Sequence, residues 1–485
     1  MFNYIKSKVV KKLILNKLKK RIKLKLLKYN KKLMELLNIT KKDFNEFVEL
    51  KELSKELKID IKDFEIAQLD LSNKNIDDKK LEYFLEKFQL FQLLKELNLG
   101  NNNITSLDKF EKKSLDKLEI LNLNNNKLSE INTLTTDIFK GLKILNLGGN
   151  EIKDINKLQN AKFNNLEELD LSNNNITDIK ILEKVNFKEL KSLNISSNQI
   201  SDIKVLENAE FKKLEKLYIS NMDISKIDFL NNLHFNELKV LDLGLNKISD
   251  LNPLKTVNFA KLEKLNLSEN NISDLSPLEI VNFKELKELI LAHNQIIKLN
   301  GLENAAFNNL EILDLKWNKG LNINKLENVK FEHLKKLDLM SCKLSDINVL
   351  EKVNFKELKE LRMNNNNICD ISVLERVNFL KLEILELESN IIKNIYVLEN
   401  VNFKELKYLS LAYNKISDTK VFERVDFPLL NNLRLNGNEI LDISSLAKLN
   451  APKLKILYLE NNKIDKNNFS DLIGELKTKF NEFYI

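Results

Sequence analysis

Histidine and cysteine are the side chains of this chain best suited to acid–base catalysis, nucleophilic attack or metal binding, and they are few. His234, His293 and His333 are far apart in the sequence, and none belongs to an HExxH motif. Cys342 and Cys369 belong to no CxxC motif and to no cluster with histidine. The glycine-rich loops that bind phosphate, GxxxxGK and GxGxxG, do not occur either. We therefore predict a protein that is not an enzyme and that has no metal site, no cofactor and no small-molecule substrate.

Aspartate and glutamate are abundant, but most of them return in the same slots of a repeated sequence. The pair Leu-x-Leu begins at Leu97 and again at Leu121, and it returns at this same interval as far as Leu457, sixteen times in all. One more copy begins at Leu69, four residues further upstream than the interval would place it. A slot that is filled in every repeat indicates a scaffold, because an active site is singular.

A single repeat shows which elements must carry these slots. Leu169 and Leu171 alternate with polar residues, which is the pattern of a short strand with one buried face. Ile176, Ile179 and Leu182 then recur at every third position, a spacing that predicts a 3-10-like or short helical return path. A strand and its return path form one coil, and coils must stack to bury their apolar sides.

An asparagine recurs five residues after the first leucine of the pair. Its amide carries donors and acceptors, so a stack of such amides can satisfy the buried backbone groups where each coil turns. An asparagine-lined binding surface is the alternative, and we favour the structural interpretation. Lys74, Met222 and Cys342 replace the asparagine in three coils, so we interpret Cys342 as a small buried substitute. The predicted structural ladder consists of Asn102, Asn126, Asn150, Asn174, Asn198, Asn246, Asn270, Asn294, Asn318, Asn366, Asn390, Asn414, Asn438 and Asn462.

Phenylalanine also holds a fixed place in the repeat. It returns thirteen times at the interval of the leucine pairs, from Phe139 to Phe427. Such a column predicts a buried spine on the return side of the coils. It does not predict an aromatic platform on which bases stack.

These residues resemble the leucine-rich-repeat family, because the pattern LxxLxLxxNxIxxI is almost intact in each repeat. The resemblance implies an α/β fold, namely a curved solenoid with a parallel sheet on its concave face. It also implies a protein-binding scaffold, since members of the family mostly work in that way. Turns such as that from Ile248 to Leu251 are most similar to the intracellular Sds22-like and internalin-like subclass. Those relatives mostly use repeats that are two residues shorter than the repeats of this chain.

In such a solenoid the residues between and just after the strand leucines face the concave side. They are small or polar in the first six repeats, and many are large from the seventh repeat on. Because exposed Trp, Tyr and Arg are enriched in interface hot spots, we predict that another protein binds here. The alternative is that the array drifted and that the large residues are incidental. The predicted partner-binding residues are Tyr218, Leu245, Ile290, His293, Trp317, Met340, Arg362, Glu386, Tyr408, Tyr413, Arg434 and Tyr458.

A solenoid exposes an apolar surface at each end and needs caps. Residues 66–465 are predicted to form the solenoid of seventeen repeats. Apolar residues at helical spacing predict a C-terminal capping helix within 466–485, with Ser470 as its N-cap. Residues 1–65 are predicted to form a basic helical segment and cap. A further helix at about residues 80–94 accounts for the four extra residues between the first two repeats.

The charge of the chain is concentrated at its N-terminus. Residues 1–42 hold fifteen Lys or Arg and one acid, Glu35, whereas the whole chain has a net charge of +7. Three hypotheses stay open for this segment. It caps the solenoid with a solvated lysine face, it binds anionic membrane or nucleic acid as a basic amphipathic helix, or it is an F-box-like adaptor of a ubiquitin ligase. In the last case the repeats would be the substrate receptor, although the usual Leu-Pro start is missing.

Location is predicted from hydropathy and cysteine usage. No stretch approaches ~18 uninterrupted apolar residues, so no membrane span is predicted. The N-terminus has no uninterrupted apolar region, so no secretory signal is predicted. Two unpaired cysteines fit a reducing compartment. We therefore predict a cytoplasmic protein.

Overall fold

The computed structural model describes residues 67–87, 94–111, 113 and 115–485. The chain divides into two compact units, which are Met1–Lys213 (the N-terminal unit) and Leu214–Ile485 (the C-terminal unit). The predicted N-terminal cap and the three hypotheses for its basic part concern residues that lie outside this description.

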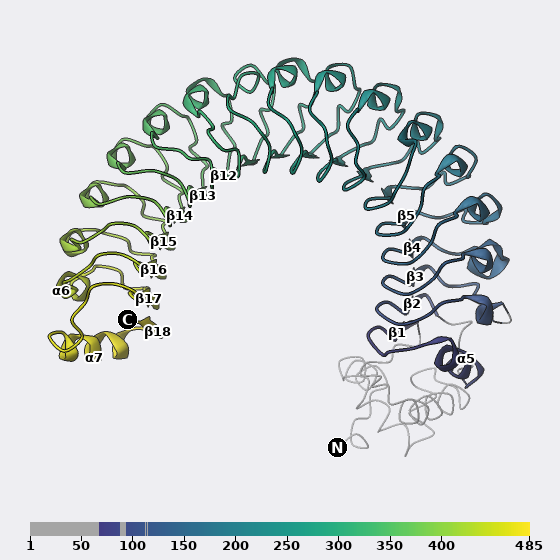
Figure 1. Cartoon of the computed structure of the whole chain (residues 1–485), viewed down its shortest axis with the longest axis horizontal. Coiled ribbons are helices and arrows are strands. Elements are labelled where there is room, and N and C mark those ends of the chain that lie inside the picture. Colours follow the sequence, from purple (N-terminus) through teal and green to yellow (C-terminus); the bar gives the residue numbers. More distant parts are fainter. Residues whose placement is uncertain (1–66, 88–93, 112, 114) are drawn as a thin grey trace, which may run out of the picture. The chain divides into compact units, whose positions relative to one another are not determined.

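Parallel strands of three residues form a sheet in the N-terminal unit. From the first strand to the sixth, each strand pairs with the next one along the chain (Figure 1). Leu69 lies opposite Leu97, and each later Leu-x-Leu of the unit lies opposite its successor. The strands are β1 (Gln68–Asp70), β2 (Glu96–Asn98), β3 (Ile120–Asn122), β4 (Ile144–Asn146), β5 (Glu168–Asp170) and β6 (Ser192–Asn194).

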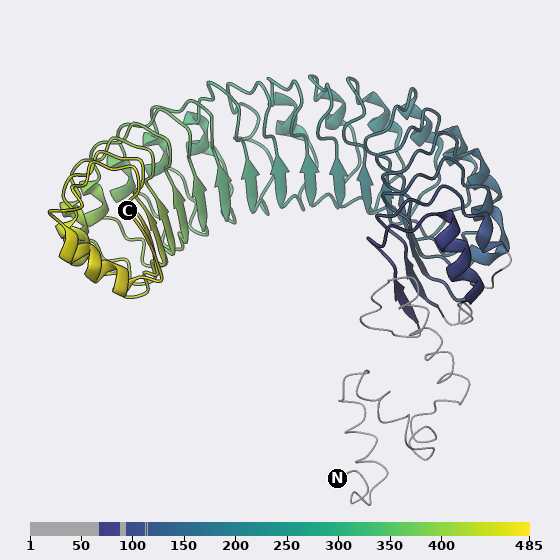
Figure 2. The same ribbon diagram turned by 60° about the horizontal axis from the view of Figure 1, so that its bottom comes forward.

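The C-terminal unit continues the same pattern with twelve strands that lie side by side (Figure 2). Within this unit the strands line the inner, concave side and the return paths lie on the outer side (Figure 1). The strands are β7 (Lys216–Tyr218), β8 (Val240–Asp242), β9 (Lys264–Asn266), β10 (Glu288–Ile290), β11 (Ile312–Asp314), β12 (Lys336–Asp338), β13 (Glu360–Arg362), β14 (Ile384–Glu386), β15 (Tyr408–Ser410), β16 (Asn432–Arg434), β17 (Ile456–Tyr458) and β18 (Glu482–Tyr484).

The constant repeat length explains this register and the core beneath it. Because each coil has the same number of residues, Leu313 lies opposite Leu337, and both are fully buried. The phenylalanine column is buried in the same core, as predicted, with the rings of Phe307 and Phe331 6.5 Å apart. Both sets remove apolar surface from water in every coil, which is the main favourable term of folding.

Short 3-10 helices form most of the return paths, as the spacing of apolar residues predicts. A side-chain hydrogen bond often fixes the start of such a helix. The N–H of Asn252, the first residue of one helix, donates to Asp250 Oδ1 at 2.8 Å. The helices of the N-terminal unit are η3 (Asp108–Phe110), η4 (Asn132–Thr135), η5 (Asp137–Phe139), η6 (Asn156–Asn160), η7 (Lys180–Glu183) and η8 (Ile203–Asn208). Those of the C-terminal unit are η9 (Asp228–Asn232), η10 (Asn252–Lys255), η11 (Ser276–Ile280), η12 (Asn324–Asn328), η13 (Asn348–Glu351), η14 (Ser372–Glu375), η15 (Tyr396–Glu399) and η16 (Lys420–Glu423), with a one-turn α-helix, α6 (Ser444–Ala447).

A column of buried amides joins neighbouring coils at the end of each strand. Asn270 is representative, because its Nδ2 donates to the carbonyls of Leu243, Leu267 and Ser268 at 3.0–3.1 Å. Its Oδ1 accepts the N–H of Ile248 at 2.9 Å. One side chain therefore bonds four backbone groups of two coils. Each of the three carbonyls also accepts a second bond, whereas the buried N–H of Ile248 has no other acceptor among the described residues.

Cys342 occupies the ladder position of its coil and is fully buried. Its thiol donates to the carbonyl of Leu315 at 3.3 Å, which replaces one bond of an amide. It offers no amide oxygen, and the N–H of Gly320 in the preceding coil donates to the Cys342 carbonyl instead. Gly320 has a φ of +86°, where a side chain is strained, so the neighbouring coil accommodates the cysteine. Burial raises the pKa of the Cys342 thiol to about 12, which leaves it unreactive.

Two α-helices lie near the ends of the described chain. The first, α5 (Asp78–Lys87), follows β1 in the region where the sequence predicts a helix. The second, α7 (Ser470–Lys479), buries Ile473 and Leu476.

Two details of the C-terminal segment differ from prediction. Ser470 is the first helical residue of α7 and not its N-cap, which is Phe469 and makes no side-chain cap bond. A strand, β18, also follows the helix and pairs with β17, with Phe483 opposite Leu457. The predicted helical cap is thus a helix and a strand, because α7 takes the return path and delivers the chain back to the sheet.

Candidate protein-binding surface on the C-terminal unit

The residue directly before each ladder position, here called the corner residue, has an unusual backbone. All seventeen corner residues have a positive φ, between 52° and 69°. Twelve of them are Asn, Ser or Gly. This composition is expected, because a larger side chain collides with its own backbone at such angles. The repeat therefore prescribes small residues at this position for a steric reason.

Five corner residues break this prescription, and all five belong to the C-terminal unit. Leu245, Glu269, His293 and Trp317 hold the corners of four consecutive coils, and Tyr413 holds another. Histidine is tolerated in this region of φ, but the other four residues adopt it at a cost of about 1–2 kcal/mol each. Strain of this kind clusters at sites of binding or catalysis, since selection for folding alone would remove it.

These corner side chains are displayed and not packed into the core. The exposed fractions of Leu245, Trp317 and Tyr413 are 49%, 38% and 49%. The rings of His293 and Trp317 stack at 5.0 Å with an interplanar angle of 15°. Tyr413 lies over Gly437 of the next coil, where an added Cβ would come within 2.4 Å of its ring. Neighbouring coils thus hold these rings in fixed orientations.

The residue between the two strand leucines, here called the strand residue, shows a second departure. In ten of the seventeen coils it is Asp or Asn, and its side-chain oxygen accepts the N–H two residues later at 2.9–3.1 Å. This local bond is a turn-forming motif, so the side chain serves the coil itself. The ten residues are Asp70, Asn98, Asn122, Asn146, Asp170, Asn194, Asp242, Asn266, Asp314 and Asp338.

The other seven strand residues have side chains of a different kind, and again all lie in the C-terminal unit. Five of them are consecutive, from β13 to β17. In one of these coils the N–H of Glu388 donates to Asn364 Oδ1 of the preceding coil instead. The seven residues are Tyr218, Ile290, Arg362, Glu386, Ser410, Arg434 and Tyr458.

A cluster of aromatic rings surrounds one of these residues. The guanidinium of Arg434 lies 5.4 Å from the ring centre of Tyr408 and 5.0 Å from that of Tyr458. The Tyr458 ring in turn stacks on Tyr484 at 4.7 Å. Burial raises the pKa of Tyr408, so its hydroxyl stays neutral. We call Tyr408, Arg434, Tyr458 and Tyr484 the Arg434 cluster.

Two charged strand residues, Arg362 of β13 and Glu386 of β14, lie on the same face, three and two strands from Arg434. Arg362 pairs with Glu360 at 3.2 Å and lies 3.9 Å from Glu386. Asn364 also donates to Glu386 at 2.6 Å. The charges of Arg362 and Glu386 are therefore compensated by described neighbours.

The structure brings some of the predicted binding residues together and leaves others apart. His293 stacks on Trp317, and Tyr408 and Tyr458 flank Arg434, as described above. Tyr218 and Ile290 are strand residues of β7 and β10, three strands apart, and Met340 directly follows the second leucine of its repeat, after β12. These three residues are half-buried on their own coils.

Three residues of this surface are absent from the sequence-based set. The repeat register places Glu269 in one row with Leu245, His293 and Trp317, but it was not counted among the predicted binding residues. Glu388 follows the second leucine of its repeat, and the predicted set contains only Met340 from that position. Tyr484 was hidden by the break in period at α7, although the alternation of Glu482, Phe483 and Tyr484 is a strand pattern.

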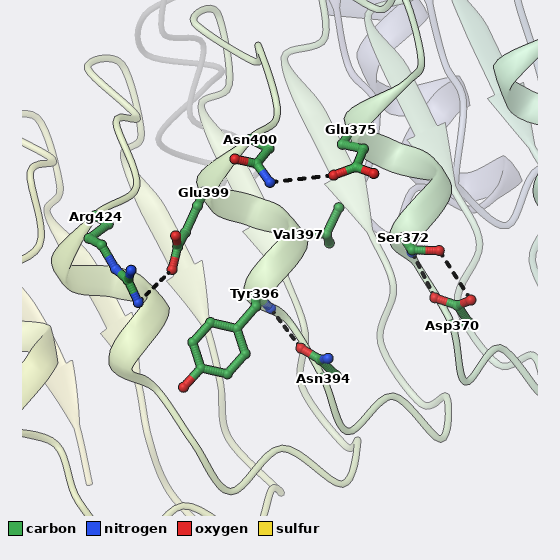
Figure 3. A pocket seen from close by; sticks show the side chains of 9 residues that line it. All are labelled: Asp370, Ser372, Glu375, Asn394, Tyr396, Val397, Glu399, Asn400 and Arg424. Atoms are coloured by element: carbon green, nitrogen blue, oxygen red, sulfur yellow. Dashed lines mark hydrogen bonds and ion pairs between the residues drawn. The ribbon is translucent and has the colours of Figure 1, made fainter.

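An open polar hollow of about 390 Å³ lies on the return side, among η14, η15 and η16 (Figure 3). Its side chains are engaged with one another: Arg424 pairs with Glu399 at 2.9 Å, and Asn400 donates to Glu375 at 3.4 Å. The Tyr396 hydroxyl donates to Asp418 at 2.6 Å and lowers the pKa of that carboxyl. The hollow therefore offers few groups to a ligand.

In the part of the chain that the structure describes, no group of three or more His, Cys, Asp or Glu residues is arranged to hold a metal ion. None of the helices described is long and apolar enough to cross a bilayer.

Parallel strands, buried leucines and an amide ladder together define a repeat solenoid. Models described as leucine-rich repeats match residues 92–136, 164–208, 236–296 and 332–347. No curated protein matches the sequence. The chain contains leucine-rich repeats.

Solved structures support the same fold. A leucine-rich-repeat protein of Leptospira interrogans is 24% identical, with a TM-score of 0.61, and the match covers 89% of this chain and 98% of that one. The plant peptide hormone receptor RGFR1, solved in complex with RGF2, is 19% identical with a TM-score of 0.54, covering 81% and 68%. TLR13, solved in complex with ssRNA13, is 22% identical with a TM-score of 0.51, covering 84% and 68%. At these identities the likeness concerns the fold alone.

Proposed function

We propose that this chain is a non-enzymatic scaffold that binds another protein through the C-terminal unit. The binding surface is the concave face of its sheet, together with the corner residues beside it. The observation that carries the proposal is the row of large corner residues with positive φ. Leu245, Glu269 and Trp317 are disfavoured by their own backbone. The fold is built without such residues in the twelve coils with small corners. A binding role explains why they are present.

The chemistry of the surface fits a protein partner. Trp, Tyr and Arg are the residue types that dominate binding energy in protein interfaces, and here they are held by stacking before a partner arrives. RGFR1, solved in complex with RGF2, and TLR13, solved in complex with ssRNA13, indicate that this fold can present a surface to a ligand. Their ligands differ, so the partner class is proposed from the residues of this chain.

The test uses the full chain as bait and compares it with one double variant. His293→Asn/Trp317→Asn gives both corners the residue that most coils carry, so the fold loses no required side chain. We expect the captured partner to bind the double variant at least about thirtyfold more weakly, as for loss of a hot spot. The melting temperature should stay close to that of the parent.

A matched substitution in the N-terminal unit provides the control. Asn173→Ser exchanges one small corner residue for another and should leave the affinity unchanged. If the double variant binds as tightly as the parent, the corner row is not the interface and the proposal is wrong.

A further inference from the structure

Two charged side chains on the concave face of the sheet of the C-terminal unit lack a partner of opposite charge. Among the ion pairs of the described residues, neither Arg434 nor Glu388 takes part, whereas neighbouring Arg362 and Glu386 do. Arg434 Nε is buried and has no hydrogen-bond acceptor within the described chain. Arg362 Nε lacks an acceptor too, but the guanidinium of Arg362 is paired with Glu360, and that of Arg434 is paired with no described carboxylate. The Glu388 carboxylate accepts a long hydrogen bond of 3.4 Å from Ser410 and no shorter one from the described residues. A buried donor without an acceptor is costly, so its retention indicates an acceptor supplied from outside.

The surroundings of Arg434 suit a carboxylate. Its guanidinium is held beside the rings of Tyr408 and Tyr458, so little side-chain freedom remains to be lost on binding. The planar guanidinium presents paired N–H groups that match the two oxygens of a carboxylate. Tyr484, stacked on Tyr458, extends a flat aromatic surface beside it.

The spacing of the two residues along the sheet indicates how long a bound peptide segment must be to reach both. Arg434 is the strand residue of β16, and Glu388 follows β14, two strands away and two residues further along. The sheet geometry gives a diagonal of about 12 Å between the two backbone positions, and an extended chain covers that distance in about three or four residues. The Glu388 carboxylate leans toward Arg434, since it lies 3.4 Å from Ser410, which is opposite Arg434 in the sheet.

We propose that this face binds an extended segment of a partner protein that places an Asp or Glu side chain on Arg434 and a Lys or Arg side chain on Glu388. The inference rests on the proposed function and assigns its chemistry. Glu386, Glu388 and Glu482 lie near the two tyrosines that flank Arg434. A carboxylate is favoured over a phosphate because Glu388 and Glu482, whose charges no described ion pair compensates, would repel the second negative charge. An internal side chain is favoured over a free carboxyl terminus because the sheet continues on both sides of β16.

Selection from a library of random twelve-residue peptides, displayed without a free carboxyl terminus, tests this directly on the full chain. We expect enriched peptides to carry an acidic and a basic residue three or four positions apart. Arg434→Gln should weaken the best of them by tenfold or more, and Glu388→Gln should weaken those with the basic residue. A phosphoserine in place of the acidic residue should bind more weakly.

The controls separate charge recognition from damage to the fold. Arg424→Gln removes a cation of the return side that pairs with Glu399, and it should leave peptide binding unchanged. Arg434→Lys keeps the charge but not the planar fork, and it should bind with intermediate affinity. All variants should melt within a few degrees of the parent.

Other outcomes would overturn the inference. It is wrong if no peptide is enriched, if the enriched peptides lack the acidic residue, if phosphoserine binds more tightly, or if Arg434→Gln has no effect. A captured partner whose binding depends on His293 and Trp317 but survives Arg434→Gln would also refute it. In that last case the proposed function would stand, so the two failures are distinguishable.

Discussion

The two units of this chain are built from one repeat but use its variable positions differently. In the N-terminal unit every corner residue is Asn, Ser or Gly, and every strand residue is Asp or Asn. In the C-terminal unit five corners are Leu, Glu, His, Trp or Tyr, and seven strand residues are neither Asp nor Asn. The buried leucines, the phenylalanine column and the amide ladder continue through both units.

This difference separates what the fold requires from what it tolerates. Six coils with small corners and bonded strand residues pack as well as the coils that lack them, because their leucines are equally buried. Packing therefore does not explain Trp317 or Arg434. The C-terminal unit departs from the repeat at its corner and strand residues. The side chains at these positions point away from the core, so a binding partner can reach them.

The largest effect is expected where the two units are alike. Asn270→Ala in the C-terminal unit and Asn174→Ala in the N-terminal unit should each cost about 1–3 kcal/mol of unfolding free energy. Each amide donates to three carbonyls and accepts one N–H. The carbonyls keep their other donors, but the N–H, of Ile248 or of Ile152, would be left buried without an acceptor among the described residues. Denaturant unfolding of both variants provides the measurement.

The exposed neighbour Asn271 supplies the control for this comparison. Asn271→Ala should leave the unfolding free energy almost unchanged, since the side chain lies at the surface. A loss for Asn270→Ala no greater than that for Asn271→Ala would contradict the role of the ladder.

A reciprocal exchange of corner residues should change stability less than the ladder variants do, and by different amounts in the two units. Asn173 has a positive φ. Asn173→Trp should destabilise the N-terminal unit by about 1–2 kcal/mol, because the indole is forced into this strained region. Trp317→Asn relieves the same strain but loses the stack on His293. Its net change should be within about 1 kcal/mol of zero, because the two contributions oppose each other. Thermal melts of both variants measure the asymmetry.

Two results would count against this account. An Asn173→Trp variant as stable as the parent would show that the corner tolerates large residues. A large loss of stability for Trp317→Asn would show that the indole supports the fold despite its exposed fraction of 38%.

Much of the fold was predictable because its determinants recur. The constant repeat length alone places Leu313 opposite Leu337 and Asn270 at the end of its strand. The apolar positions that follow, as at Ile176 and Ile179, were sufficient to predict 3-10 return paths. A repeated environment selects the same residue many times, so a single sequence contains many samples of one rule.

The rest depends on relations that a periodic pattern does not contain. The abundance of Asn, Ser and Gly at the corner was visible, but the positive φ that makes Trp317 unusual is a backbone property. The missing partners of Arg434 and Glu388 emerge only when side chains of adjacent coils are placed together. The strand at Tyr484 lies after α7, where the period breaks.

The smallest expected effect concerns carboxylates at the strand position. In the N-terminal unit Asp170 lies between strands whose strand residues are Asn146 and Asn194, whereas in the C-terminal unit Asp338 lies next to Asp314. Burial raises the pKa of Asp338, and repulsion by Asp314 adds to the shift. A carboxyl whose pKa is higher in the folded chain than in the unfolded chain destabilises the fold when it is charged.

Asp338→Asn should therefore raise the melting temperature at pH 7. The amide keeps the oxygen that accepts the Met340 N–H at 3.1 Å, and ten coils show that Asn and Asp are exchangeable here. The gain should shrink as the pH falls through the raised pKa and vanish below about pH 4, the ordinary value for Asp, because the parent carboxyl is then neutral in both states. Asp170→Asn is the control and should give a smaller change, since Asp170 is half-exposed and has no carboxylate as a strand neighbour. A melting temperature of Asp338→Asn below that of the parent at pH 7, with the deficit disappearing toward acid pH, would show that the charged carboxylate stabilises this face, and the two units would then treat their strand residues alike.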